Sequence, residues 1–185
     1  MTQVRAEGLA AALARSVPPL VWIHGDEPLL VQEAAQAVRD ALRAAGFAER
    51  QVFDGGRGFR PDAFAAEADA LSLFASRKLI ELRLAGRPTK ETGQLLADTG
   101  ARASDDTRLL VSGPRLDRAT TESAWFAALD RIALIVPIWP IERAQLPQWI
   151  GARLARQHQR ADRATLELIA ERVEGNLLAA HQEIG

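Results

Sequence analysis

The stretch LVWIHGDEPLL (residues 20–30) decides the fold of this chain. Its first four residues are all apolar, which predicts a strand buried on both faces. A turn follows, in which Asp26 can cap the next helix and Pro28 suits its first turn. Apolar residues then recur at helical spacing over residues 30–42. The stretch therefore predicts a buried strand that leads directly into an amphipathic helix.

Strand and helix patterns alternate along the rest of the first 138 residues. The residues that favour further strands are 51–53, 78–84, 109–111 and 132–136, and those that favour further helices are 61–70, 88–99 and 120–129. The alternation within 78–84 indicates a strand with one wetter face. A regular alternation of apolar strands and helices predicts an α/β fold, with a parallel sheet covered by helices on both faces.

The pattern changes at Pro137–Pro140, after which only helices are expected. Their expected ranges are 145–157, 162–173 and 176 onward, with Asp162 and Asn176 as caps and Gly175 after the second helix. We therefore divide the chain near Ile138, into an α/β domain (1–138) and a small helical domain (139–185). The last helix barely begins its apolar face before residue 185, which suggests that the sequence was cut from a longer one.

Composition excludes several classes of protein. The 185 residues are 48% hydrophobic and 25% charged, which is ordinary for a soluble globular protein. The net charge of -1 gives no general basic field, so any contact with DNA needs a local patch or a partner. The absence of Cys excludes disulfides and thiolate metal sites and suits the cytoplasm. We find no signal peptide, and no apolar run approaches the ~18 residues of a membrane helix.

The turn after the first strand stands where an α/β nucleotide-binding domain holds phosphate. A phosphate-binding loop needs Gly for close approach, Lys for the phosphates and Ser or Thr for magnesium. This turn offers Gly25, Asp26, Glu27 and Pro28 instead. Two carboxylates repel phosphate and the proline removes an amide donor. The sequence therefore predicts a degenerate phosphate loop and no ATP hydrolysis.

Other candidate sites are weaker. The three histidines lack metal-ligand spacing, so polar or surface roles are expected for His24, His158 and His181. Asp105-Asp106 precedes a strand and is interpreted as a solvated turn. A basic face with Arg153, Arg156 and Arg160 is interpreted as solvated, with contact to DNA phosphate as the alternative. The four tryptophans, which lie among apolar neighbours, are expected in the core: Trp22, Trp125, Trp139 and Trp149.

The stretch LSLFASR (residues 71–77) places two Leu and a Phe in a connection between a helix and a strand. Such connections usually run over the surface and are polar. From the residues alone, two interpretations remain open for the adjacent pair Leu73 and Phe74. They either pack into the core of the domain or contact a partner protein.

Five segments together resemble one known family, and they span almost the whole chain. They are HGDEPLL (24–30), LSLFASR (71–77), AWF (124–126), QLPQW (145–149) and EGNLLAA (174–180). The chain resembles the δ subunit of bacterial DNA polymerase III, a clamp-loader component. The resemblance implies an AAA+-like fold of the P-loop NTPase type: a five-stranded parallel sheet domain followed by a three-helix lid. It covers the first two domains of that family and not its third, the helical collar.

The resemblance also implies a site. In the family, an apolar pair enters a pocket on the sliding clamp, and by motif this pair is Leu73 and Phe74. Leu71, Ser72 and Arg77 would support the contact. Leu178 stands where related ATPases carry a nucleotide-contacting arginine in the lid. These matches imply a non-catalytic subunit without cofactor or metal.

The partners that the resemblance implies are the beta sliding clamp, the gamma/tau ATPase and delta-prime subunits, and DNA indirectly through the complex. No membrane partner is implied, the location is the cytoplasmic replisome, and any DNA polymerase activity belongs to the holoenzyme. Two alternatives come from other classes. One is a nucleotide-dependent enzyme with an unusual phosphate loop. The other is a weak DNA-binding module that uses the basic face at residues 153–160.

Overall fold

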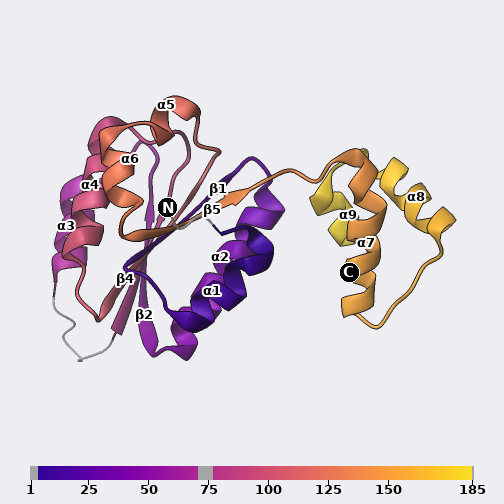
Figure 1. Ribbon diagram of the computed structural model, residues 1–185, viewed down its shortest axis with the longest axis horizontal. Coiled ribbons are helices and arrows are strands. Elements are labelled where there is room, and N and C mark those ends of the chain that lie inside the picture. The colour runs from indigo at the N-terminus through magenta and orange to yellow at the C-terminus, as the bar shows by residue number, and fades with distance from the viewer. Residues whose placement is uncertain (1–3, 71–76, 185) are drawn as a thin grey trace. The chain divides into compact units, whose positions relative to one another are not determined.

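The computed structural model describes residues 4–70 and 77–184, and the chain divides after Ile138 into two compact units. In the first unit, five strands form one sheet in the order β2-β3-β4-β1-β5. All four neighbouring pairs are parallel. Helices cover both faces of this sheet (Figure 1). The α/β fold with a parallel sheet that the sequence predicts is therefore confirmed.

The elements of the first unit follow the predicted order. The strands are β1 (Leu20–Gly25), β2 (Phe47–Asp54), β3 (Arg77–Arg83), β4 (Thr107–Gly113) and β5 (Ala133–Ile138). The helices are η1 (Ala6–Gly8), α1 (Leu9–Arg15), α2 (Pro28–Ala44), α3 (Pro61–Asp69), α4 (Lys90–Arg102), α5 (Arg118–Thr121) and α6 (Ala124–Leu129). The range 120–129, which predicts one helix, holds parts of two, because Ser123 caps a new helix through the amide of Phe126.

The sheet separates two apolar cores. One core packs α3, α4 and α6 on the sheet, with Trp22, Phe64 and Trp125 among its buried members. The other packs α1 and α2 on the opposite face, with Ile23 and Val38 among its members. All six residues of β1 are buried, as the apolar run predicts. The central strand therefore contributes side chains to both cores.

The edge strand β5 carries an unusual residue. Pro137 lies within β5, which pairs with β1 on one side. This position is compatible with proline, because an edge strand does not need every amide for the ladder. Near the start of the described chain, the amide of Val4 donates to the carbonyl oxygen of Ile135 at 3.0 Å. That bond occupies a carbonyl of the edge strand.

Helices α4 and α6 pack closely through a glycine. A Cβ built on Gly93 would lie 2.3 Å from Cδ2 of Trp125, so only a residue without a side chain fits there. Trp125 in turn stacks on Trp22 of β1, with ring centroids 6.0 Å apart. The glycine thus lets the indole lie between the helix and the sheet.

One expectation about burial is wrong, and another holds only in part. Trp139 is 54% exposed and is not a core residue. The face of β3 that alternation marks as wetter is exposed at Arg83 but not at Glu81, which is only 1% exposed. Sequence alternation records polarity, and it could not show that arginines from other elements cover this carboxylate.

The second unit contains η2 (Arg143–Gln145), α7 (Leu146–Arg156), α8 (Arg163–Arg172) and α9 (Leu177–Ile184). Asp162 accepts a hydrogen bond from the amide of Thr165 at 2.8 Å, and Asn176 accepts one from Ala179 at 3.0 Å. Gly175 has φ of +85°, a left-handed conformation that favours glycine. These three residues act as the sequence predicts.

Candidate protein-contact edge and phosphate turn

The degenerate phosphate loop lies at the carboxyl end of β1. Gly25 ends the strand, Glu27 precedes α2 without capping it, and Pro28 occupies the first helical turn. The prediction that Asp26 caps α2 is wrong. Its Oδ1 instead accepts a hydrogen bond at 3.1 Å from the amide of Arg115, in the loop after β4.

His24 holds the same loop. Its Nδ1 accepts a hydrogen bond from the amide of Leu116 at 3.3 Å, and the side chain is 8% exposed. Burial, aided by the charge of Arg115 and opposed by that of Asp26, lowers the pKa of His24 to about 4. The imidazole is therefore a neutral acceptor at physiological pH. Of the polar or surface role that the sequence suggests for His24, the structure shows the polar one, in a buried position.

These contacts fill the turn from within the chain. A Cβ on Gly25 would lie 2.5 Å from the backbone oxygen of Ile138, so the glycine serves the β1–β5 pairing. Burial also raises the pKa of Glu27. The turn contains the carboxylates of Asp26 and Glu27. The loop after β4 is hydrogen-bonded to it through Arg115 and Leu116. This arrangement disfavours a phosphate group at the turn.

The predicted contact residues Leu71, Ser72, Leu73 and Phe74 lie outside the described residues. The structure describes what flanks them: α3 ends at Asp69, and Arg77 begins β3. The contacts of Lys78 and Arg77 describe how the chain is held on either side of this segment.

Lys78 binds the carboxyl end of α3. Its Nζ donates to the carbonyl oxygen of Glu67 and, at 2.6 Å, to that of Ala70, and the Glu67 carboxylate lies 3.6 Å away. Lys78 is only 5% exposed. A buried ammonium that satisfies the last carbonyls of a helix also interacts favourably with the helix dipole. Sequence reasoning missed this residue, although a lysine at the second position of an apolar strand is a signal of such a contact.

Arg77 is braced on the other side. Its Nε lies 3.3 Å from Asp106 Oδ1, and its Nη1 donates to the carbonyl oxygen of Ala45 at 3.2 Å. The guanidinium also lies 5.5 Å from the centre of the Phe47 ring. The side chain thus connects the start of β3 to the end of α2 and to the loop before β4. Asp106, which the sequence places in a solvated turn, therefore also forms an ion pair with Arg77.

In the second unit, Leu178 is 50% exposed on α9. The predicted basic face is smaller than its sequence indicates. Arg153 is 8% exposed, and its guanidinium lies 4.0 Å from the centre of the Trp149 ring, while Arg156 and Arg160 are exposed. The interpretation of Arg153 as a solvated residue is therefore wrong, because its charged group packs on an indole.

Two kinds of site are absent from the described ranges 4–70 and 77–184. No group of three or more His, Asp or Glu side chains there could hold a metal ion. No helix in this part of the chain is long and apolar enough to cross a membrane.

Most of the first unit matches a known protein family. The sequence profile of the family described as DNA polymerase III, delta subunit, matches residues 22–138, which include the phosphate turn and the segment 71–77. The chain belongs to this family. The resemblance drawn from the five sequence segments is therefore confirmed.

Two curated members of the delta family resemble the whole chain. DNA polymerase III subunit delta of Escherichia coli K12 is 35% identical over 186 residues, and that of Haemophilus influenzae is 20% identical over 187. In both cases all of this chain and 54% of the relative are matched. The chain spans about half the length of these relatives.

Solved structures agree on the fold. The Bacillus subtilis DNA clamp loader delta protein matches with a TM-score of 0.68 and 19% identity, over 97% of this chain and 56% of that protein. A Thermotoga maritima RuvB variant matches with a TM-score of 0.58 and 17% identity, over 95% and 56%. The delta chain therefore shares the AAA+-like architecture of clamp-loader and RuvB proteins.

Proposed function

We propose that this delta-family chain is a non-catalytic clamp-loader subunit that binds and opens the beta sliding clamp. Leu73 and Phe74 form the contact, with Leu71 and Ser72 beside them and Arg77 at its base. The observation that carries the proposal is the family match over residues 22–138, which includes this segment. The braces at Lys78 and Arg77 support it, because they fix the two chain ends between which the segment lies.

The proposed contact has a simple energetic basis. Full burial of a Leu or Phe side chain is worth roughly 1.5–3 kcal/mol, and a small, dry cluster of such residues forms a hot spot. A binding partner shifts a conformational equilibrium only by its difference in affinity for the two states. Clamp opening follows if the Leu73–Phe74 contact is stronger with the open ring than with the closed ring.

The energy for loading comes from other chains in this proposal. The turn at Gly25–Pro28 lacks the lysine and hydroxyl of a phosphate loop, and Asp26 is bound to the loop after β4. ATP is bound by the gamma/tau subunits, delta-prime completes the loader, and the assembly acts on primed DNA in the cytoplasm. Saturable binding of ATP at micromolar concentration by the full-length protein would contradict the non-catalytic assignment.

The test of the contact is the double substitution Leu73→Ala and Phe74→Ala in the full-length protein. We expect the dissociation constant for the cognate beta clamp to rise about 100-fold or more, since two hot-spot side chains are truncated. Surface plasmon resonance with immobilised clamp measures this directly.

A matched control removes two exposed leucines from the second unit. Leu168 is 64% exposed and Leu178 is 50% exposed, so Leu168→Ala with Leu178→Ala deletes apolar surface of the same kind. This control is expected to bind the clamp as the unchanged protein does. Equal affinities of all three proteins would refute the role of Leu73 and Phe74.

A further inference from the structure

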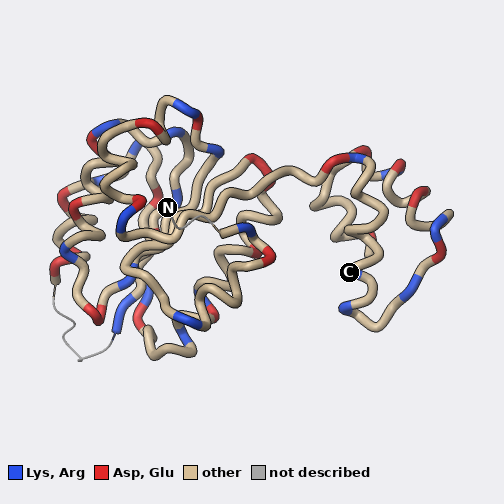
Figure 2. Tube along the Cα trace, viewed as in Figure 1, with Lys and Arg blue, Asp and Glu red and all other residues tan. Residues whose placement is uncertain are grey.

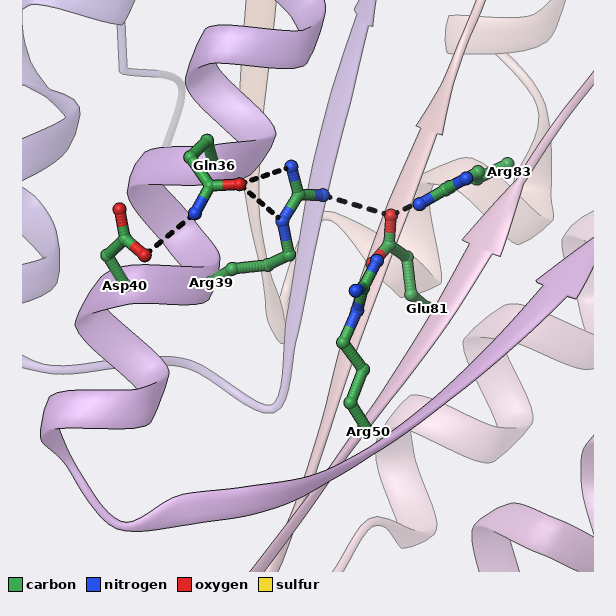
Figure 3. A network of polar contacts seen from close by, with 6 residues as sticks. All are labelled: Gln36, Arg39, Asp40, Arg50, Glu81 and Arg83. Carbon is green, nitrogen blue, oxygen red and sulfur yellow. Dashed lines mark hydrogen bonds and ion pairs between the residues drawn. The ribbon is translucent and has the colours of Figure 1, made fainter.

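Glu81, in the middle of β3, lies among three arginine side chains that come from three elements (Figure 3). Arg39 of α2 donates from Nη1 to Oε1 at 3.1 Å. Arg50 of β2 donates from Nε and Nη2 to Oε2 at 2.9 and 2.6 Å. Arg83 of β3 donates from Nε to Oε1 at 3.0 Å. We call these four residues the Glu81 cluster.

Arg39 is the structural partner of this carboxylate. Its side chain is 16% exposed, and its Nε and Nη2 donate to Gln36 Oε1 at 3.1 and 2.9 Å. Burial raises the pKa of Glu81, but hydrogen bonds from Arg50 and Arg83 and the charge of Arg39 outweigh it and lower the pKa. The buried carboxylate is thus fully ionised near neutral pH.

Arg50 and Arg83 differ from Arg39 in exposure. Their side chains are 38% and 51% exposed, so both guanidinium groups reach solvent. A guanidinium carries five N–H donors. Toward the described residues, Arg83 hydrogen-bonds through Nε and Arg50 through Nε and Nη2. The remaining nitrogens can therefore donate to a further acceptor.

The cluster also has an excess of positive charge. Three guanidinium groups face one carboxylate, and the charges of Arg50 and Arg83 lower the pKa of Arg39, after the larger effect of its burial. An additional anion would relieve this repulsion.

Two neighbouring carboxylates reduce the excess without removing it. Asp40 lies 3.9 Å from Arg43 and accepts from Gln36 at 2.7 Å, and Asp54 is opposite Arg83 in the register of β2 and β3. When Arg43, Asp40 and Asp54 are added to the cluster, the region holds four arginines and three acidic residues. Its net charge is then +1. Elsewhere on the chain the two signs are interspersed (Figure 2), and the whole chain carries -1.

We propose that Arg50 and Arg83 bind one phosphate group of a DNA backbone. A backbone phosphate carries a single negative charge, which matches the one positive charge that remains when Arg43, Asp40 and Asp54 are counted with the cluster. Arg50 and Arg83 reach the Glu81 carboxylate from two neighbouring strands, and the remaining donors of a planar guanidinium suit the oxygens of a phosphate. An acidic protein segment carries several charges and fits an extended basic surface better than this compact one. The site goes beyond the proposed clamp contact and lies on other residues.

The first test observes the two side chains directly. The full-length protein is titrated with a short DNA duplex while the Nε–Hε resonances of its arginines are followed by NMR. We expect the Arg50 and Arg83 resonances to shift together and to return as salt is added. Parallel titrations use inorganic phosphate and a poly-glutamate peptide. Shifts with the duplex and phosphate support the site, whereas no shift with the duplex, or a shift with the peptide alone, would overturn it.

The second test uses the variants Arg50→Gln and Arg83→Gln. We expect each to weaken duplex binding about fivefold and to reduce the slope of log affinity against log salt by about 0.9, the loss of one phosphate contact. Arg118→Gln is the matched control, because Arg118 is 88% exposed and pairs with Glu122 on α5. An equal loss in the control would refute the assignment.

A conservative pair separates a folding defect from a lost contact. Arg50→Lys with Arg83→Lys keeps both charges but removes the planar donors. We expect this protein to retain the salt slope, to bind more weakly and to keep its thermal unfolding midpoint within a few degrees. If the lysine variant binds the duplex as tightly as the unchanged protein, arginine-specific recognition of phosphate is refuted.

Discussion

At the residue scale, the phosphate turn separates what the sequence could predict from what it could not. The absence of lysine and hydroxyl at Gly25–Pro28 is visible in the sequence, and it predicts a turn that cannot hold nucleotide. The partners of His24 and Asp26 are not visible, because Arg115 and Leu116 lie about 90 residues further along the chain. Local rules therefore assigned Asp26 to a helix cap that does not form.

The lowered pKa of His24 gives a prediction of pH dependence. The folded state favours the neutral imidazole, so its contribution to stability is complete above the unfolded pKa of 6.5 and is lost as the pH falls toward 4. We expect the free energy of unfolding to decrease by about 2 kcal/mol between pH 7 and pH 5 from this residue. Urea denaturation at both values measures the change.

His24→Asn is the control for this prediction. The asparagine Oδ1 can replace Nδ1 as the acceptor for the amide of Leu116, but it does not titrate. The variant should lose less stability between pH 7 and pH 5 than the unchanged protein. If both proteins show the same change, another group causes the pH dependence.

At the scale of elements, helices and strands with a strong apolar periodicity were predicted correctly. Where the periodicity is weak, the predicted ends of the element were inaccurate. The residues 51–53 indicate a brief strand, yet β2 covers eight residues, since it pairs with β3 along its length. Glu81 was assigned to a wet face because its arginine partners belong to α2 and β2 as well as to β3. Contacts between elements decide such features.

The packing of α4 on α6 predicts that a Gly→Ala substitution destabilises the protein, although this change usually stabilises a helix. Gly→Ala in a helix interior normally stabilises by about 1 kcal/mol. At Gly93 the new methyl group would lie 2.3 Å from the Trp125 ring, and overpacking of this kind costs about 1–3 kcal/mol. We therefore expect Gly93→Ala to lower the free energy of unfolding by up to about 2 kcal/mol, the overpacking cost less the helix gain. Chemical denaturation measures the difference.

Gly100→Ala is the matched control on the same helix. Its nearest contact would be the terminal methyl group of Ile132 at 2.9 Å, which can rotate away. We expect a smaller loss of stability than at Gly93. A stabilised Gly93→Ala protein would show that the Trp125 ring shifts at little cost.

At the scale of the whole molecule, the alternation of strands and helices was sufficient to predict a parallel sheet, but it could not give the strand order. Nothing in residues 47–54 indicates that β2 lies at one edge, next to β3 and far from β1. The family resemblance supplied the five-stranded architecture as a whole. The contact residues 71–74 remain a prediction, because they lie outside the described residues.

The division after Ile138 gives a prediction for a fragment. Both cores of the first unit consist of residues from 9 to 138, so neither depends on the second unit. We expect a fragment of residues 1–138 to unfold cooperatively in a thermal melt. We also expect it to bind the beta clamp within about threefold of the full-length affinity, roughly 0.6 kcal/mol. A folded fragment that fails to bind would place part of the clamp contact elsewhere.

The proline in β5 has a consequence for how the molecule behaves at high concentration. The free edge of a sheet is a template on which another chain can add a strand, and this is a common start of aggregation. Pro137 has no amide to offer such a strand, and the carbonyl of Ile135 is already bound to Val4. The opposite edge, β2, carries the charged residues Arg50 and Asp54, and charged side chains on an edge strand disfavour the addition of another strand. Both margins of the sheet therefore resist the growth of fibres in the crowded cell.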